Sequence, residues 1–110
     1  MSDKVFSSKL GTTRAGERTR IWLEGKRLLD HGFHCTAMVR RQWSEGKLVL
    51  TIVDEPAFDA LPRDERTTVA GSDARPIIDI ATAKVSETFR GERVRVAYRQ
   101  GRITITNEED

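Results

Sequence analysis

The sequence has few of the features that mark secreted, membrane-embedded or disulfide-stabilised proteins. Its single cysteine, Cys35, cannot form an internal disulfide, so a reducing, cytoplasmic setting is the default expectation. It contains no run of roughly 18 apolar residues, and its N-terminus lacks the apolar stretch of a secretory signal. A chain of 110 residues, 33% charged and 37% apolar, is therefore expected to form one small soluble domain without a membrane partner.

Residue patterns typical of catalytic or metal sites are also scarce. His31, His34 and Cys35 lie close together, but their spacing does not fit a zinc finger and no second pair of ligands follows. Asp79, just before an expected helix, is better explained as a helix cap than as a general base. No Ser–His–Asp or paired-carboxylate arrangement is recognisable. The sequence therefore predicts a protein that is not an enzyme and needs no cofactor or metal.

Charge is distributed unevenly, although the net charge is only +2. Residues 1–53 carry ten basic and five acidic groups, residues 54–73 two and six, and residues 74–107 seven and three, while residues 108–110 are all acidic. Two basic modules therefore flank an acidic connector. Arginine outnumbers lysine by fourteen to five, which favours bidentate phosphate contacts; a GC-rich coding bias with a solvated surface would give the same count.

The C-terminal third has the clearest secondary-structure pattern. Residues 77–80 predict a strand, residues 82–89 a short helix that ends before Gly91, and residues 93–99 and 102–106 the two strands of a hairpin. The hairpin strands alternate between an apolar and a basic side. The inward positions are Val94, Val96, Tyr98, Ile103 and Ile105, and the outward basic positions are Arg93, Arg95, Arg99 and Arg102.

The first half follows the same order with a less regular pattern. Residues 18–24 predict a strand, residues 26–31 a short helix closed by Gly32, and residues 36–43 and 48–53 two further strands. The aromatic side chains expected in the core are Trp22, Trp43 and Tyr98.

Segments outside these two units are assigned by composition. Residues 1–16 are expected to form an arm that is either flexible or docks late in folding, and residues 17–107 a single domain. Within the connector, residues 54–73, one helical turn is expected at residues 57–61 and an edge strand at residues 66–70.

The two βαββ units, residues 17–53 and 74–107, can be laid over each other as an internal repeat. An offset of 56 places Ile21 on Ile77, Leu29 on Val85 and Phe33 on Phe89, and an offset of 55 matches the hairpins. The hairpin matches are Val39 with Val94, Trp43 with Tyr98, Gly46 with Gly101, Leu48 with Ile103 and Leu50 with Ile105.

Arg41 is the exception, because it falls on Val96, a core position. A buried arginine without a partner is costly. Either Arg41 lies in a special environment or the first hairpin has a shifted register. The shift, which is the simpler alternative, would place Met38, Arg40 and Gln42 on one face.

The segment IWLEGKRLLDHGF, followed by V-x6-GKLVL, resembles the swapped-hairpin, AbrB-type proteins, and in particular the branch that includes SymE-like toxins. The second unit, PIIDI…F-x4-VRV-x4-GRITI, is similar to the same pattern but less closely. The resemblance rests on Gly25, Leu28, Leu29, Gly32, Phe33, Val39, Gly46, Leu48, Val49 and Leu50.

The resemblance implies an α+β, mostly β fold in which duplicated βαββ units form a small swapped-hairpin-like β-barrel with short helices. Two chains usually supply the halves of such a barrel, whereas here one chain could supply both. It also implies DNA binding through arginines on strands and loops, as in transition-state regulators and antitoxins.

The leading hypothesis is a small DNA-binding regulator or antitoxin-like protein that contacts the phosphate backbone through arginines. The alternatives are a non-enzymatic inhibitor or accessory module of a phage or plasmid system and, with least support, a SymE-like toxin. Besides DNA, a protein partner and a homodimer are considered, and the basic strand face could instead be solvated and charged only against aggregation. The candidate contact residues are Arg18, Arg20, Arg27, Arg40, Arg41, Arg93, Arg95, Arg99 and Arg102.

Overall fold

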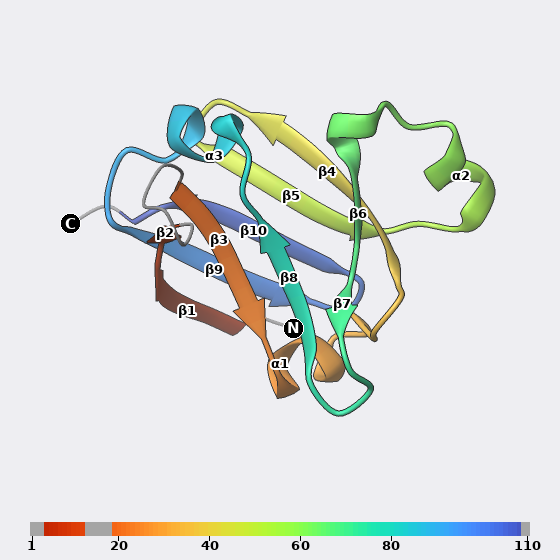
Figure 1. Ribbon diagram of the computed structural model, residues 1–110. Coiled ribbons are helices and arrows are strands. Elements are labelled where there is room, and N and C mark those ends of the chain that lie inside the picture. Colours follow the sequence, from red (N-terminus) through yellow and green to blue (C-terminus); the bar gives the residue numbers. More distant parts are fainter. Residues whose placement is uncertain (1–3, 13–18, 109–110) are drawn as a thin grey trace.

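Two antiparallel sheets and three short helices make up the part of the chain that the computed structural model describes, residues 4–12 and 19–108 (Figure 1). The larger sheet contains β1 (Lys4–Lys9), β4 (Met38–Ser44), β5 (Lys47–Ile52), β6 (Arg66–Thr68), β9 (Arg93–Arg99) and β10 (Arg102–Asn107). The smaller sheet contains β2 (Gly11–Thr12), β3 (Thr19–Glu24), β7 (Ala70–Gly71) and β8 (Pro76–Ile80). The helices are α1 (Lys26–Asp30), α2 (Glu55–Asp59) and α3 (Ala83–Thr88), with a 3-10 turn η1 (Arg63–Glu65). The prediction of a mostly-β α+β domain is confirmed.

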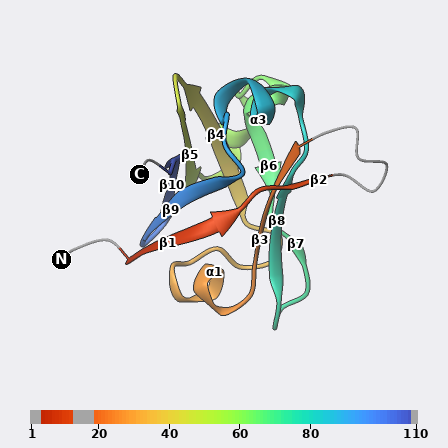
Figure 2. The same ribbon diagram turned by 90° about the vertical axis from the view of Figure 1, so that its left-hand side faces the viewer.

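The two sheets lie on either side of one hydrophobic core (Figure 2). The strand order is β1-β9-β10-β5-β4-β6 in the larger sheet and β2-β3-β8-β7 in the smaller. The chain passes between the sheets at two corners, where Leu10 and Val69 are buried. The smaller sheet ends in β2 and β7, each of only two residues. The described residues therefore form two open sheets and not the closed barrel that the resemblance implies.

Strands from the two halves of the chain pair with each other in both sheets. Leu50 of β5 lies opposite Ile103 of β10, and Leu23 of β3 lies opposite Ile78 of β8. At the edges of the larger sheet, β1 pairs with β9 and β6 with β4. The order of strands and helix is β-β-β-α-β-β in each half, with α2 and η1 between the halves. Each half thus begins with two more strands than the βαββ unit expected from the sequence.

Two residues of the first half that were predicted to face the core, Leu29 and Trp22, are each next to the residue that is buried instead. Leu28 of α1 is fully buried, as Val85 of α3 is, whereas Leu29 is only half-buried. Trp22 is 40% exposed, so its assignment to the core is wrong. The reason is strand alternation: Ile21 and Leu23 face the core, and the side chain between them must face outward.

The alternative of a shifted first hairpin is also wrong. Trp43 lies opposite Leu48, and the equivalent residues Tyr98 and Ile103 lie opposite each other in the second hairpin. The two hairpins therefore have the same register, and Arg41 does occupy the inward position that Val96 holds in the other half. It is only 9% exposed.

Arg41 therefore lies buried in a special environment, as the other of the two predicted alternatives stated. Its Nη2 donates to the Arg63 carbonyl over 3.4 Å, while its Nε has no hydrogen-bond partner. Burial lowers the pKa of Arg41, and the nearby carboxylate of Asp64 partly offsets that effect. One wall of the core therefore holds a guanidinium with little polar compensation.

The N-terminal and connector segments are more ordered than composition alone indicates. Of the two alternatives for the N-terminal segment, docking is the one observed for residues 4–9, which pair with β9 along their full length. Residues 11 and 12 of the predicted arm pair with β3, and its residues 1–3 and 13–16 lie outside the described residues. In the connector, residues 66–70 contribute β6 and the start of β7, and the helical turn begins earlier than expected, where Asp54 accepts a hydrogen bond from Ala57 N at 3.0 Å.

Candidate nucleic-acid interface

The outer side of the larger sheet is the side that faces away from the smaller sheet (Figure 2). It concentrates basic side chains from both halves of the chain. Because cross-strand partners share one side of a sheet, the pairing registers identify the residues of this side. We call it the basic face. Its basic members are Lys9, Arg40, Lys47, Arg66, Arg93, Arg95, Arg99 and Arg102.

Rows of cross-strand partners run over the basic face. A first row, near the start of β10, consists of Arg99, Arg102, Thr51, Arg40 and Arg66. Four steps between neighbouring strands separate its ends, a span of roughly 19 Å at about 4.8 Å a step. A second row consists of Ser7, Arg95, Thr106, Lys47 and Ser44.

The strip between these rows is uncharged. It consists of Val5, Ala97, Thr104, Val49 and Gln42. Arg95 and Arg99 are four residues apart on one strand, which places the two rows about 13 Å from each other. The basic face therefore has two cationic lines separated by a neutral surface of apolar and uncharged polar side chains.

At one corner of the basic face, Arg93 contacts two other side chains. Its Nε donates to Ser7 Oγ at 2.8 Å and lies 3.6 Å from a carboxylate oxygen of Glu108. Lys9 lies directly opposite Arg93 on β1. This corner thus combines two cations with one acidic side chain.

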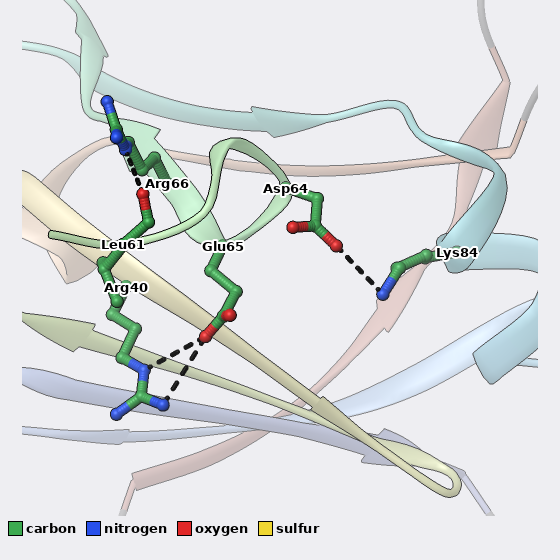
Figure 3. Close-up of polar contacts among 6 residues, drawn as sticks. All are labelled: Arg40, Leu61, Asp64, Glu65, Arg66 and Lys84. Atoms are coloured by element: carbon green, nitrogen blue, oxygen red, sulfur yellow. Dashed lines mark hydrogen bonds and ion pairs between the residues drawn. The ribbon is translucent and has the colours of Figure 1, made fainter.

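The opposite end of the first row is in contact with the connector (Figure 3). Arg40 lies 3.5 Å from Glu65 Oε1. Arg66 donates to the carbonyls of Leu61 at 2.7 Å and Asp59 at 3.1 Å. Arg40 and Arg66 are therefore held by the connector, and Arg66 in particular is committed to the backbone of its own loop.

Arg20 and Arg27, two more of the predicted contact residues, lie elsewhere. Arg20 is on β3 of the smaller sheet, where its guanidinium forms a fork with both Asp79 carboxylate oxygens at 3.0 and 2.5 Å. The assignment of Asp79 as a helix cap is therefore wrong, since Asp79 lies within β8 and Thr82 is the N-cap of α3. The hydrogen bond to Asp79 raises the pKa of Arg20. Arg27 is on α1, with its guanidinium 3.5 Å from the centroid of the Phe6 ring.

The remaining predicted contact residues fall into two groups. Arg41 is buried on the core side of β4, away from the basic face, and Arg18 lies outside the described residues. The structure brings together Arg40, Arg93, Arg95, Arg99 and Arg102.

Sequence reasoning missed three basic members of this face. Lys47 could have been found from the alternation of β5, in which Leu48 and Leu50 point inward. Lys9 requires knowing that β1 is a strand paired with β9, and Arg66 requires the pairing of β6 with β4. Neither long-range pairing has a signal in the local sequence.

His31 and Cys35 are engaged in separate contacts. His31 Nδ1 lies 2.7 Å from the Arg27 carbonyl, and its ring packs on Tyr98. Cys35 Sγ donates to the Gly71 carbonyl at 3.5 Å. In residues 4–12 and 19–108, no three His, Cys, Asp or Glu side chains group so that they could hold a metal ion. No helix in this part of the chain is long and apolar enough to cross a membrane.

A polar hollow lies between the β4–β5 turn and the end of α3. Its volume is about 350 Å³. It is lined by Ser44, Glu45, Gly46, Glu87, Thr88, Arg90 and Asn107. The Asn107 side chain closes one side, since its Oδ1 accepts from Arg90 N at 3.2 Å and its Nδ2 donates to the Thr88 carbonyl at 3.4 Å. The hollow carries no arrangement that identifies a ligand.

Comparison with known proteins adds no further assignment to this geometry. No protein-family model, curated protein or solved structure matches the chain.

Proposed function

We propose that the protein is a small DNA-binding regulator or antitoxin-like protein that contacts the phosphate backbone through its basic face. The observation that carries the proposal is the pairing of β5 with β10, which brings arginine and lysine from both halves of the chain onto one outer surface. Clustered cations on one face are the electrostatic signature of nucleic-acid binders. The net charge is only +2, but nine of the 17 acidic groups (six and three) lie in residues 54–73 and 108–110, outside the two basic modules.

The chemistry of the neutral strip favours backbone contact over base stacking. Proteins that bind single strands generally present aromatic rings on which bases stack. Along the described strands of the larger sheet, the aromatic residues Phe6, Trp43 and Tyr98 occupy core-side positions. The two cationic rows would instead contact phosphates on either side of the neutral strip, with binding that depends strongly on salt and weakly on sequence.

The pairing between the halves also supports a relationship to the swapped-hairpin proteins. Both sheets contain a central pair with one strand from each half, β5 with β10 and β3 with β8. Interlocked halves of this kind are what the resemblance implies, with one chain supplying both. We infer that the two halves are copies of one ancestral unit.

The proposal is tested by removing Arg95 and Arg102, one from each cationic row. Arg95→Gln and Arg102→Gln are expected to weaken binding to a duplex of any sequence. Each change should make the slope of log K against log salt shallower by about 1. Arg75→Gln is the matched control, because Arg75 precedes β8 of the smaller sheet and is exposed there, 3.9 Å from Glu24.

Gel-shift or fluorescence-anisotropy titrations at several salt concentrations measure both quantities. If all three variants lose the same amount of affinity, the loss reflects net charge and not contacts of the basic face. Wild-type binding that does not change with salt would rule out the proposed phosphate contacts.

One observation favours a second candidate, a protein–protein accessory module. Trp22 is 40% exposed on the outer side of the smaller sheet, and the Arg20 guanidinium lies 4.7 Å from the centroid of its ring. Tryptophan and arginine are enriched among residues that dominate protein interfaces. If this surface binds a partner, Trp22→Ala should abolish capture of that partner and leave duplex affinity unchanged. Loss of capture on Arg95→Gln instead would assign the partner to the basic face.

A further inference from the structure

The contact between Arg40 and Glu65 joins the basic face to the acidic connector (Figure 3). Glu65 Oε1 lies 3.5 Å from both Nε and Nη2 of Arg40. Charge-assisted hydrogen bonds of this type are usually about 2.7–2.9 Å long. The pair is therefore loose, and both side chains keep partial exposure, 42% for Arg40 and 29% for Glu65.

The backbone around Glu65 is fixed by other contacts. Glu65 N donates to the Pro62 carbonyl at 3.0 Å within η1. The neighbouring Asp64 points toward α3, where it pairs with Lys84 at 3.2 Å (Figure 3). On the other side, Arg66 bonds back to Leu61 O. Glu65 is thus presented to Arg40 by an ordered turn.

A similar arrangement occurs at another corner of the basic face. Glu108, just beyond β10, lies 3.6 Å from Arg93, whose side chain is 51% exposed. An intramolecular carboxylate therefore accompanies an arginine in each half of the chain, Arg40 in the first and Arg93 in the second. A carboxylate is the side chain that resembles a phosphate oxygen most closely in charge and hydrogen-bond geometry.

We propose that Glu65 is an intramolecular competitor that occupies Arg40 in place of a phosphate and so lowers the affinity of the basic face for nucleic acid. Glu108 has the same role at Arg93. The inference rests on the proposed function, because it concerns regulation of the same surface. It predicts that Arg40 contributes little to binding by the wild-type protein and becomes a phosphate contact once Glu65 is neutralised.

The experiment is a double-mutant cycle on duplex binding with Glu65→Gln, Arg40→Gln and the combined variant. Glu65→Gln is expected to bind about two- to fivefold more tightly, the range that a surface ion pair can account for. Its salt dependence should be steeper by about 1, because one more phosphate contact forms. Arg40→Gln alone should change affinity by less than about twofold, and adding it to Glu65→Gln should cancel the gain.

Two controls separate competition from net charge. Glu87→Gln removes the same charge from α3, and Asp64→Asn removes it one residue away on the side of η1 that faces Lys84. Neither should steepen the salt dependence. Thermal melts of all variants report whether each is folded, which matters most for Asp64, whose charge also lies near Arg41.

The outcomes distinguish this inference from the function on which it rests. If Glu65→Gln and Glu87→Gln tighten binding equally, or if Arg40→Gln weakens the wild-type protein as much as Arg95→Gln does, competition by Glu65 is refuted while DNA binding stands. If neither the wild type nor any variant binds a duplex, the proposed function itself fails.

Discussion

Replacing the buried Arg41 by methionine is expected to stabilise the fold. Arg41 is 9% exposed, and Val96 occupies the equivalent position in the other half. The charged side chain makes one long hydrogen bond, 3.4 Å to the Arg63 carbonyl, and leaves Nε unpaired. Methionine is unbranched and flexible, so it can fill the space of the arginine stem without placing a charge in the core.

The magnitude follows from the two terms that change. A hydrogen bond from a charged donor contributes about 1.5–3 kcal/mol at good geometry, and a 3.4 Å contact belongs at or below the lower end of that range. Against this stands an effective desolvation penalty of several kcal/mol for a buried ion. We therefore expect Arg41→Met to raise the free energy of unfolding by about 1–2 kcal/mol, within the range found when buried ions are replaced by apolar side chains.

Urea unfolding followed by tryptophan fluorescence measures this change, with an unaltered m-value as evidence that the unfolded state is the same. Gln42→Met on the exposed side of the same strand is the control and should have little effect. Arginine stays protonated in proteins, so the stabilisation should be the same from about pH 5 to pH 8. A loss of more than about 1 kcal/mol in Arg41→Met would refute the reasoning and mean that contacts of the guanidinium outweigh its desolvation.

Three further predictions concern the fold. Gly71→Ala should destabilise the fold by more than about 2 kcal/mol, because Gly71 has a φ of +88° and a new Cβ would collide with the Arg75 carbonyl. Gly101→Ala, at a φ of +73° but with open space around the new Cβ, should cost only about 1 kcal/mol. Thermal melts of both variants test this difference. Ile103→Ala, at a fully buried residue where the two halves meet, should cost about 2–5 kcal/mol in chemical unfolding, and Thr104→Ala on the outer side under about 1 kcal/mol. Burial raises the pKa of Tyr98, the single tyrosine, so the folded protein favours the protonated phenol. The resulting contribution to the free energy of unfolding should be complete below about pH 10 and lost as the pH rises through the raised pKa. A tyrosinate absorbance titration with its midpoint at or below pH 10 would contradict that expectation.

Local alternation was enough to predict the second hairpin. Val94, Val96 and Ile103 are buried as expected, and Arg95 and Arg102 are exposed. A period of two residues fixes which side of a strand each residue takes once the strand is identified. The error at Trp22 arose because residues 21–23 are all apolar, so the sequence offered no alternation that separates the inward from the outward side chains.

The arrangement of the candidate site depended on information that local patterns do not contain. Arg40 and Arg102 share one row only because β5 pairs with β10 in the observed register. Arg41 shows the opposite case, because its position on the core side could be matched from the sequence. The cost of burying its charge made a shifted hairpin register the simpler prediction. Physical expectation favoured an apolar residue there, and the structure tolerates an arginine by placing the Arg63 carbonyl and Asp64 nearby.

The pairing of β1 with β9 has a consequence for synthesis of the chain on the ribosome. Residues 4–9 are synthesised long before their hydrogen-bonding partners, residues 93–99. Strand β5 likewise awaits β10. The larger sheet can therefore be completed only after β9 and β10 have been translated, and Val5 and Phe6 stay unpaired until then. Such late, long-range pairing slows folding and leaves apolar strand edges open to other chains in the meantime.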